Sequence, residues 1–173
     1  MTDSAGTAHA TVDALGRPMD VTDKAGHVTK YAYGPFGGVT RVDHPGGHAT
    51  TMTRDAYGRV RQHVDPDRGE SSTDYDGFGE PTFTVDALGR AYAFGYDALG
   101  RMIRRDDPDG ITTWEHDTAA HGKGLIGSVV SPAGHTRSFT YDDLSRPHTV
   151  MLALGDSGET FVSTFRYVKS VVL

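Results

Sequence analysis

The stretch Tyr96-Asp97-Ala98-Leu99-Gly100-Arg101 decides the fold, because related stretches precede it at a fixed interval. Each carries one large apolar residue, and these stand at Leu15, Phe36, Tyr57, Phe78 and Leu99. The interval between successive members is 21 residues, four times running. A fixed period of this length is typical of repeat architectures, so the chain is predicted to be an array of one small structural unit.

The repeat is defined by a tyrosine, an aspartate, the large apolar residue, a glycine and an arginine. We predict a structural role for the residues at these positions, which are Asp13, Leu15, Gly16, Arg17, Tyr33, Phe36, Gly37, Asp55, Tyr57, Gly58, Arg59, Tyr75, Asp76, Phe78, Gly79, Tyr96, Asp97, Leu99, Gly100, Arg101, Tyr141, Asp142 and Leu144. The pattern assigns them no catalytic, cofactor-binding or metal-binding role.

Each unit also contains a second, looser turn signal of the type Asp-x-x-Gly. Counted from the apolar residue, its glycine comes eleven residues later at Gly26, Gly47, Gly89 and Gly110, and twelve later in the copy at 65–69. Two turns in one unit leave two segments of about six or seven residues, which is ordinary strand length. Each unit is therefore predicted to be a β-hairpin with a tight turn at each end. The predicted fold class is all-β, with repeated hairpins in a continuous twisted ribbon.

Aromatic residues alternate in the strand that enters the first turn. The spacing of two residues recurs in Tyr31 and Tyr33, in Tyr92, Phe94 and Tyr96, in Trp114 and His116, in Phe139 and Tyr141, and in Phe165 and Tyr167. Residues two apart in a strand lie on one face. Stacked hairpins would make these rings cross-strand neighbours, which predicts a structural ladder. The alternative is an aromatic platform that stacks sugars.

The period stretches after His116-Asp117. Tyr96 and Tyr141 are 45 residues apart, which is two periods plus a three-residue insertion, and the insertion is predicted to widen a hairpin end. Near the end of the chain, 155–158 is predicted to turn and Phe161 to Leu173 to form a last strand. The whole chain, 1–173, is thus predicted to be a single array, with clear repeats at 11–116, a variant unit at 117–140 and a degenerate terminal unit at 141–173.

Composition excludes several classes of function. The chain has no cysteine, which excludes disulfides, thiolate metal sites and a cysteine nucleophile. Its net charge is −6 with both signs mixed along the chain, so nucleic acid is a poor candidate partner. No stretch approaches the roughly 20 apolar residues of a membrane span. Residues 1–10 lack the basic start and apolar core of a signal peptide.

Several polar groups are weak candidates for chemistry. Asp65 with Asp67, and Asp106, Asp107 and Asp109, resemble parts of calcium loops but lack the remaining oxygen ligands, so turn capping explains them better. His44 and His48 flank Pro45-Gly46-Gly47, which makes a zinc site improbable. Ser128, Ser131 and Ser138 lack a nucleophile elbow, and Gly122-Lys123-Gly124 is far short of a phosphate loop. Arg17, Arg59, Arg90, Arg101 and Arg146 recur near turn exits and are predicted to pair with the aspartates of the repeat. We therefore expect no enzyme activity and no cofactor.

The run from Tyr96 to Gly110, YDALGRMIRRDDPDG, resembles a consensus copy of the RHS/YD repeat. The stretch at 116–125 resembles a variant unit of the same family, and the resemblance covers about residues 11–146. Departures are Val12, Arg54 and His116 at the tyrosine position, Gly34 at the aspartate position and Ser145 at the glycine position. The aspartyl self-cleavage site that ends many bacterial shells has no counterpart here.

The resemblance implies a β-ribbon that spirals into a hollow shell. In bacterial RHS effectors and insecticidal toxin-complex proteins the shell encloses a toxic domain, and in teneurins a similar shell supports adhesion. The expected function is thus a non-catalytic shell segment that encloses or carries a toxin or effector domain, secreted or delivered by a bacterial export system. Expected partners are neighbouring shell segments or the enclosed domain, with self-association through strand edges. The alternative is a cell-surface repeat module that binds carbohydrate or protein.

Overall fold

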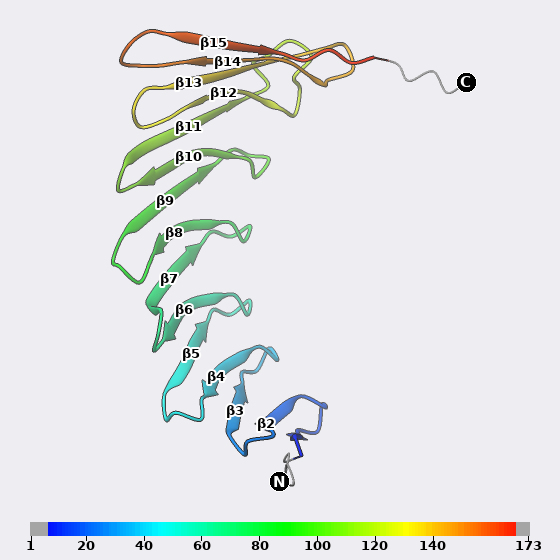
Figure 1. Ribbon diagram of the computed structural model, residues 1–173, viewed down its shortest axis with the longest axis vertical. Coiled ribbons are helices and arrows are strands. Elements are labelled where there is room, and N and C mark those ends of the chain that lie inside the picture. The colour runs from blue at the N-terminus through cyan, green and yellow to red at the C-terminus, as the bar shows by residue number, and fades with distance from the viewer. Residues whose placement is uncertain (1–6, 169–173) are drawn as a thin grey trace, which may run out of the picture. The chain divides into compact units, whose positions relative to one another are not determined.

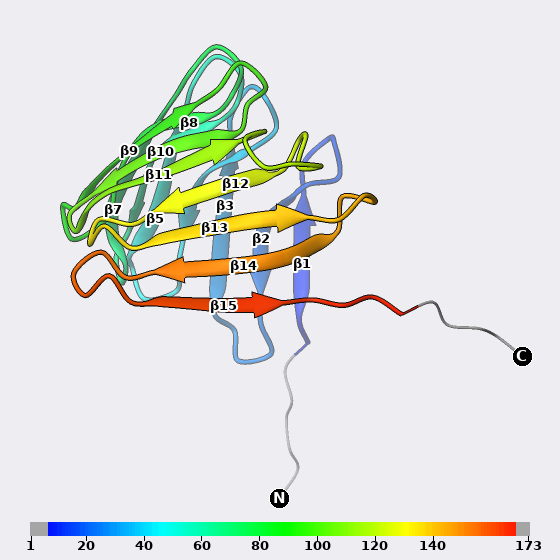
Figure 2. The same ribbon diagram turned by 90° about the horizontal axis from the view of Figure 1, so that it is seen from above.

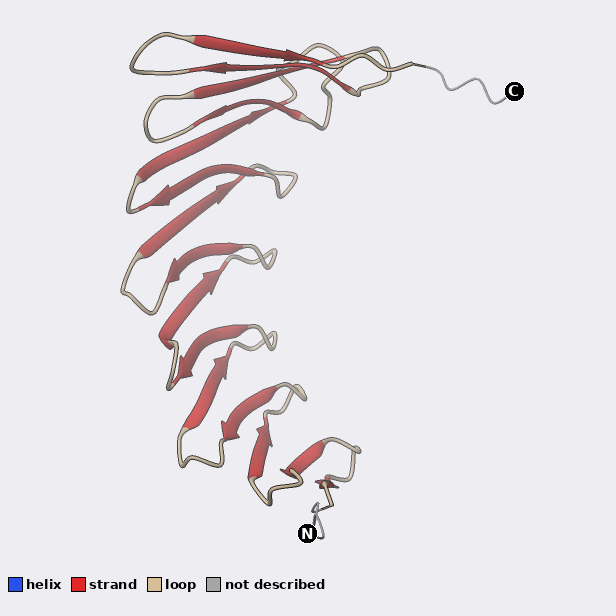
Figure 3. Cartoon of the chain, in the orientation of Figure 1, coloured by secondary structure: helices blue, strands red, loops and turns tan. Residues whose placement is uncertain are grey.

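The computed structural model describes residues 7–168, and within that range it consists of strands and loops without a helix (Figure 3). The chain divides into two compact units, residues 1–90 and 91–173. Each unit is a meander of antiparallel strands joined by short loops, which confirms the predicted all-β class and the predicted hairpins.

The first unit contains eight strands, each paired antiparallel with the next in chain order (Figure 1). They are β1 (His9–Val12), β2 (Pro18–Thr22), β3 (Val28–Tyr33), β4 (Val39–Asp43), β5 (Ala49–Arg54), β6 (Val60–Asp65), β7 (Gly69–Tyr75) and β8 (Pro81–Val85). Because the strands alternate in direction, all loops that follow odd-numbered strands lie at one edge of this unit, where strand ends meet, and all loops that follow even-numbered strands lie at the opposite edge.

The second unit contains seven strands in the same arrangement, and Figure 2 shows β12 to β15 side by side. They are β9 (Ala91–Tyr96), β10 (Met102–Asp107), β11 (Gly110–His116), β12 (Ile126–Val130), β13 (Thr136–Tyr141), β14 (Pro147–Ala153) and β15 (Thr160–Thr164). The insertion after His116 forms the loop 117–125, closed by an Asp117 N–H bond to the Leu125 carbonyl at 3.0 Å. It widens a hairpin end, as predicted.

The register shifts by one residue at the end of the strand before each first turn. In the first unit the shifts fall between Thr11 and Val12, Ala32 and Tyr33, Thr53 and Arg54, and Asp74 and Tyr75. Such an irregularity increases the local twist and re-aims the side chain beside it. The re-aimed residue is the one at the tyrosine position of the repeat, which prepares the contacts described below.

Neither unit has a hydrophobic core of the usual kind. In the described range no large apolar side chain is buried, and the most buried polar residues are Thr50 and Thr112, with exposed fractions of 6% and 7%. The predicted alternation is seen in β3, where Tyr31 and Tyr33 are half-buried and Ala32 is exposed, but not at 92–96, where every residue is half-buried. Stability therefore depends on ladder hydrogen bonds and on cross-strand side-chain contacts.

The second turns are tight, as predicted: loops 23–27, 44–48, 86–90 and 131–135 have the same backbone bonds as the first turns, although their sequence signal is looser. The turns at 65–69 and 107–110 differ, because Asp65 pairs directly with Gly69 and Asp107 with Gly110. The turn at 154–159 is one residue longer, closed by the Leu154 N–H bond to the Glu159 carbonyl. The predicted last strand, however, ends early, at Thr164, and leaves Phe165 and Tyr167 outside it, while 169–173 lies outside the described residues.

Candidate functional site

The first turn of the repeat is organised by its aspartate. In the loop 55–59 the Asp55 N–H donates to the Arg59 carbonyl at 2.9 Å, and the Gly58 N–H donates to the Asp55 carbonyl at 3.0 Å. The Asp55 Oδ1 then accepts the N–H groups of Tyr57 at 2.9 Å and Arg59 at 3.0 Å. One side chain thus satisfies two backbone donors that the tight turn leaves without a carbonyl partner.

The second carboxylate oxygen of the aspartate holds the arginine four residues later. Asp55 Oδ2 accepts the Arg59 Nε–H at 2.6 Å. Equivalent ion pairs join Asp13 to Arg17, Asp86 to Arg90, Asp97 to Arg101 and Asp142 to Arg146. The recurring arginines therefore pair with the aspartates of their own turns.

These contacts keep the aspartates ionised in acid. The hydrogen bonds from the Arg146 side chain and backbone lower the pKa of Asp142 to about 2, against an ordinary value of 3.8. The pKa of Asp117 is also lowered to about 2, first by the hydrogen bond from Arg101 and then by the Gly124 N–H. Arg101 links the two acidic residues of its region, since its guanidinium lies 2.7 Å from Asp97 and 2.8 Å from Asp117.

Acid is therefore expected to destabilise the second unit. A carboxyl whose pKa is lower in the folded than in the unfolded state contributes stability above the unfolded value, and this is lost as the pH falls through the folded value. For Asp117 and Asp142 the window runs from about 4 down to about 2. Urea unfolding at a series of pH values should show a falling midpoint there, and Asp142→Asn should flatten the dependence. Equal pH dependence in the variant and the parent would contradict this.

The tyrosine of the repeat bonds back to the preceding hairpin. The hydroxyl of Tyr75 donates to the Val60 carbonyl at 3.1 Å, across a separation of 15 residues. Tyr33 bonds in the same way to Pro18 at 2.7 Å, and Tyr141 to Ile126 at 2.7 Å. In each case the acceptor is the first residue of the strand that follows the preceding first turn: β6 for Tyr75, β2 for Tyr33 and β12 for Tyr141.

The arginine of one turn covers the tyrosine of the next. The guanidinium carbon lies 4.3 Å from the ring centroid for Arg17 over Tyr33, and 4.6 Å for Arg59 over Tyr75. In the second unit Arg146 lies 4.1 Å from the ring centroid of Tyr167, whose hydroxyl donates to the Pro147 carbonyl at 2.9 Å. These distances are within the range of cation–π attraction. Each Asp–Arg–Tyr contact thus joins two neighbouring hairpins. The predicted ladder of neighbouring rings is wrong, because the register places Val42 opposite Tyr31 and Val129 opposite Trp114.

Two departures from the tyrosine position keep the same bond with different chemistry. The Arg54 guanidinium donates from Nη2 to the Val39 carbonyl at 3.1 Å, and from Nη1 to the Gly58 carbonyl at 2.8 Å. The His116 Nε2 lies 2.9 Å from the Met102 carbonyl. The sequence identified both residues as departures at the tyrosine position but did not predict their bonds. The signal for these bonds is a position one residue before the turn together with an available N–H donor.

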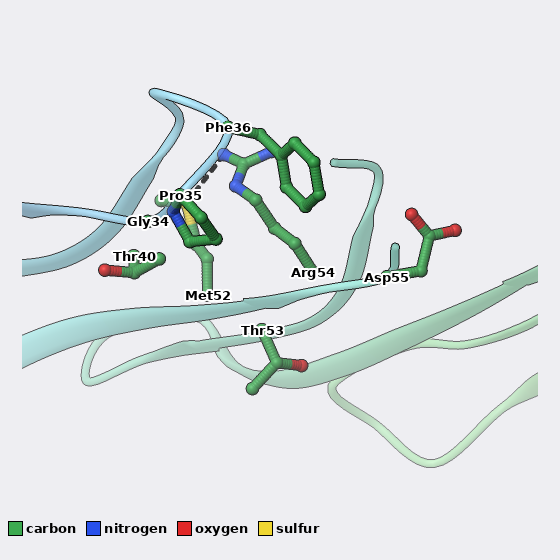
Figure 4. Close-up of a pocket in the computed structure, with 8 residues that line it drawn as sticks. All are labelled: Gly34, Pro35, Phe36, Thr40, Met52, Thr53, Arg54 and Asp55. Atoms are coloured by element: carbon green, nitrogen blue, oxygen red, sulfur yellow. Dashed lines mark hydrogen bonds between the residues drawn. The ribbon is translucent and has the colours of Figure 1, made fainter. Parts of the chain in front are cut away.

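Arg54 lies in a shallow pocket of about 190 Å³ that is lined by Phe36 and Met52 among others (Figure 4). Its guanidinium occupies space that Gly38 leaves open, because a Cβ at Gly38 would come within 2.7 Å of the Arg54 Cζ. Gly38 stands where Arg17 and Arg59 stand in other copies. In other copies the arginine at this position covers the tyrosine of the next first turn. Here the next tyrosine position is Arg54, and its own guanidinium fills the space that the missing arginine leaves.

An exchange of these two residues tests that interpretation. Gly38→Arg alone should destabilise the chain, since its side chain meets Arg54, and Arg54→Tyr alone leaves the new ring without a covering guanidinium. The double variant should restore the common arrangement, with a favourable coupling of about 1–2 kcal/mol in urea unfolding. Additive effects of the two substitutions would contradict the proposed equivalence.

The other departures also fit the common turn. Gly34 stands at the aspartate position, yet its N–H still donates to the Gly38 carbonyl at 2.9 Å. Ser145 stands at the glycine position with φ of 58°, and its hydroxyl donates to the His121 carbonyl at 2.8 Å. The backbone loop is therefore kept without the full set of repeat residues.

The polar candidates for chemistry have local partners. Asp65 Oδ1 accepts the N–H groups of Asp67 and Arg68, both at 3.0 Å, as a turn-capping aspartate does. His44 Nε2 lies 2.9 Å from the Thr50 hydroxyl, which donates to Asp65 Oδ2 at 3.0 Å. Across residues 7–168 no group of three or more histidine or acidic side chains is placed to hold a metal ion. The same range contains no helix with the length and apolar character needed to cross a membrane.

The large apolar residue of each first turn is largely exposed. Leu15, Tyr57, Phe78 and Leu99 have exposed fractions of 77%, 81%, 94% and 76%. Phe36 is exposed to 61% and Leu144 to 71%. The ring of Tyr57 also lies 5.1 Å from the guanidinium carbon of Arg59 in the same loop.

Known proteins contain similar repeats and a similar hairpin fold. The family model of the RHS repeat matches residues 12–49 and 75–113. No curated protein matches the chain significantly. Among solved structures, the Tc holotoxin pore of Photorhabdus luminescens has 15% sequence identity and a TM-score of 0.66, over 94% of this chain and 10% of that chain.

Two further structures show the same fold. The complex of TcdB2-TccC3 with Cdc42 has 13% identity and a TM-score of 0.53, over 96% of this chain and 11% of that one. TcdB2-TccC3 without its hypervariable C-terminal region has 13% identity and a TM-score of 0.54, over 95% and 11%. The chain thus spans about a tenth of the length of the structures it resembles. The chain thus contains two segments that match the RHS-repeat family model, and its hairpin fold is similar to part of these Tc toxin structures.

Proposed function

We propose that this chain is a structural segment of an RHS shell and that the shell encloses a toxin or effector domain. The observation that carries the proposal is the fold itself, a hairpin array that corresponds over 94% of its length to part of a Tc holotoxin chain. The role is mechanical: the segment forms part of a wall and performs no chemical step. Delivery by a bacterial export system is part of the same proposal.

The strand edges support a role within a longer array. β1 and β15 have a neighbouring strand on one side within their units, and all of their residues are exposed. Exposed edge strands present unpaired N–H and carbonyl groups and readily accept another strand. Further RHS strands are the partners that such edges fit, and self-association of the isolated chain through the same edges is expected on the same grounds.

The aromatic residues favour the wall over a sugar-binding platform. A ring that stacks a sugar needs a free face, but Tyr33 and Tyr75 are each covered by an arginine and bonded through their hydroxyl groups. The rings therefore contribute to contacts between hairpins. Binding of carbohydrate or protein at a cell surface is the less supported function.

Expression of the complete reading frame that contains this chain tests the proposal. Electron cryomicroscopy should show a hollow particle with density inside, and limited proteolysis should leave the enclosed domain intact. The control is the same domain expressed without the repeats, which should be digested rapidly. Equal digestion of both, or an open sheet without an interior, would refute enclosure, and saturable binding on a glycan array would favour the alternative.

A further inference from the structure

Four large apolar side chains form a row along one edge of the first unit. This apolar row consists of Leu15, Phe36, Tyr57 and Phe78, which occupy the third position of the loops 13–17, 34–38, 55–59 and 76–80. All four loops follow odd-numbered strands and so lie at the same edge. Exposed fractions between 61% and 94% show that contacts within the chain leave the row largely uncovered.

The opposite edge provides an internal control for what the turn itself requires. The third positions there are Ala25, Gly46, Asp67 and Leu88, so three of the four are small or charged. The loop 23–27 nevertheless has the same backbone bonds, from Asp23 N–H to the His27 carbonyl at 3.0 Å and from Gly26 N–H to the Asp23 carbonyl at 3.1 Å. Turn formation therefore does not explain a large apolar residue at every first turn. The row is thus available to a partner outside this hairpin array.

Charge limits the kind of partner. In the loops 13–17 and 55–59 an aspartate is paired with an arginine, and 34–38 contains no charged residue. Three of the four loops thus carry no net charge. The row offers apolar surface without a charged field, so its partner should be apolar rather than a polyanion or a polycation.

Spacing identifies the partner. Each repeat adds two strands, so successive members of the row stand about 10 Å apart. A partner that fills every interval must present apolar groups at the same interval, and a second copy of the row does so automatically. The geometry points to a two-fold homodimer in which the apolar row of one molecule packs against the apolar row of a second copy of this chain. In a two-fold contact the same surface serves both partners.

The contact is small, since it involves four side chains from each copy. We therefore expect weak, concentration-dependent association, as is usual for interfaces well below about 1,200 Å². The proposal does not depend on enclosure of a toxin domain, because it concerns only the edge of the hairpin array. A result that refutes the dimer would leave the proposed enclosure unaffected, and a result that refutes enclosure would leave the dimer unaffected.

Sedimentation velocity of the full chain over a wide concentration range tests the proposal. The wild type should shift from monomer to dimer. The variant with Leu15→Ala, Phe36→Ala, Tyr57→Ala and Phe78→Ala should raise the dissociation constant at least about tenfold. Alanine suits these loops, because Ala25 occupies the equivalent position of a loop with the same backbone bonds. Leu88→Ala is the matched control, with a side chain 76% exposed on the opposite edge, and should leave association unchanged.

Crosslinking tests the geometry of the dimer. The chain has no cysteine, so introduced thiols report only on themselves. With the two-fold axis perpendicular to the row, Phe36 of one copy faces Tyr57 of the other, so Phe36→Cys combined with Tyr57→Cys should give disulfide-linked dimers, whereas Leu88→Cys should give none. A monomer at all concentrations would overturn the proposal. So would a dimer that survives loss of the row but is abolished by Ala10→Pro in β1, because that result would show pairing through the strand edge.

Discussion

Tyr75→Ala is expected to lower the free energy of unfolding by about 2–3 kcal/mol. The substitution removes a half-buried ring 4.6 Å from the Arg59 guanidinium and a hydroxyl that donates to the Val60 carbonyl at 3.1 Å. Both contacts join one hairpin to the previous one, and no hydrophobic core compensates for their loss. Urea unfolding monitored by circular dichroism measures the change.

Tyr57→Ala is the matched control for that experiment. Tyr57 is the same residue type in the same unit, but its side chain is 81% exposed, and the Arg59 guanidinium 5.1 Å from its ring belongs to the same loop, not to a neighbouring hairpin. Its replacement should change the stability of the monomer by no more than about 0.5 kcal/mol. Tyr75→Phe, which keeps the ring and removes the hydroxyl, should cost about 1 kcal/mol. Equal effects of Tyr57→Ala and Tyr75→Ala would show that the hairpin contacts do not stabilise the array.

Gly58→Val is expected to destabilise the chain by about 2–3 kcal/mol. The residue has φ of +82°, a conformation that a β-branched side chain rarely adopts, and a Cβ there would lie 3.4 Å from the Cβ of Phe36. The strain falls in the loop 55–59, whose closure sets the register of β5 and β6. Thermal unfolding of the variant and the parent measures the difference in their stability.

Ala56→Val in the same loop separates backbone strain from the effect of a larger side chain. Ala56 is exposed and does not have positive φ. The substitution should therefore be nearly neutral. If it destabilises the chain as much as Gly58→Val, the left-handed conformation is not the cause.

Most of the fold could be predicted from the sequence, because residue types mark both the 21-residue repeat and the two-residue alternation within strands. Turn residues mark the 21-residue unit, and alternating aromatic residues mark the face of each strand. The similarity of the two turns was harder to predict, since His44 and Ser131 replace the aspartate at the second turn while the backbone bonds stay the same. The early end of β15 had no signal, because Phe161 to Tyr167 keeps a strand-like composition.

The contacts between hairpins could be predicted only in part. The pairing of Asp55 with Arg59 follows from their proximity in a tight turn. The contact of Tyr75 with Val60 depends on the strand register, which no local pattern reveals. Arg54 shows the limit most clearly, because a departure from the consensus preserves the bond through a different donor, and only the spatial arrangement shows that the two are equivalent.

The backward reach of the tyrosines has a consequence for synthesis of the chain. Tyr33 and Tyr75 each bond to a carbonyl 15 residues nearer the N-terminus, so every hairpin finds its docking surface in chain that has already been made. Such short-range contacts form quickly, and folding can proceed in step with translation. An array of this kind can grow at the ribosome one hairpin at a time, with each finished unit serving as the template for the next.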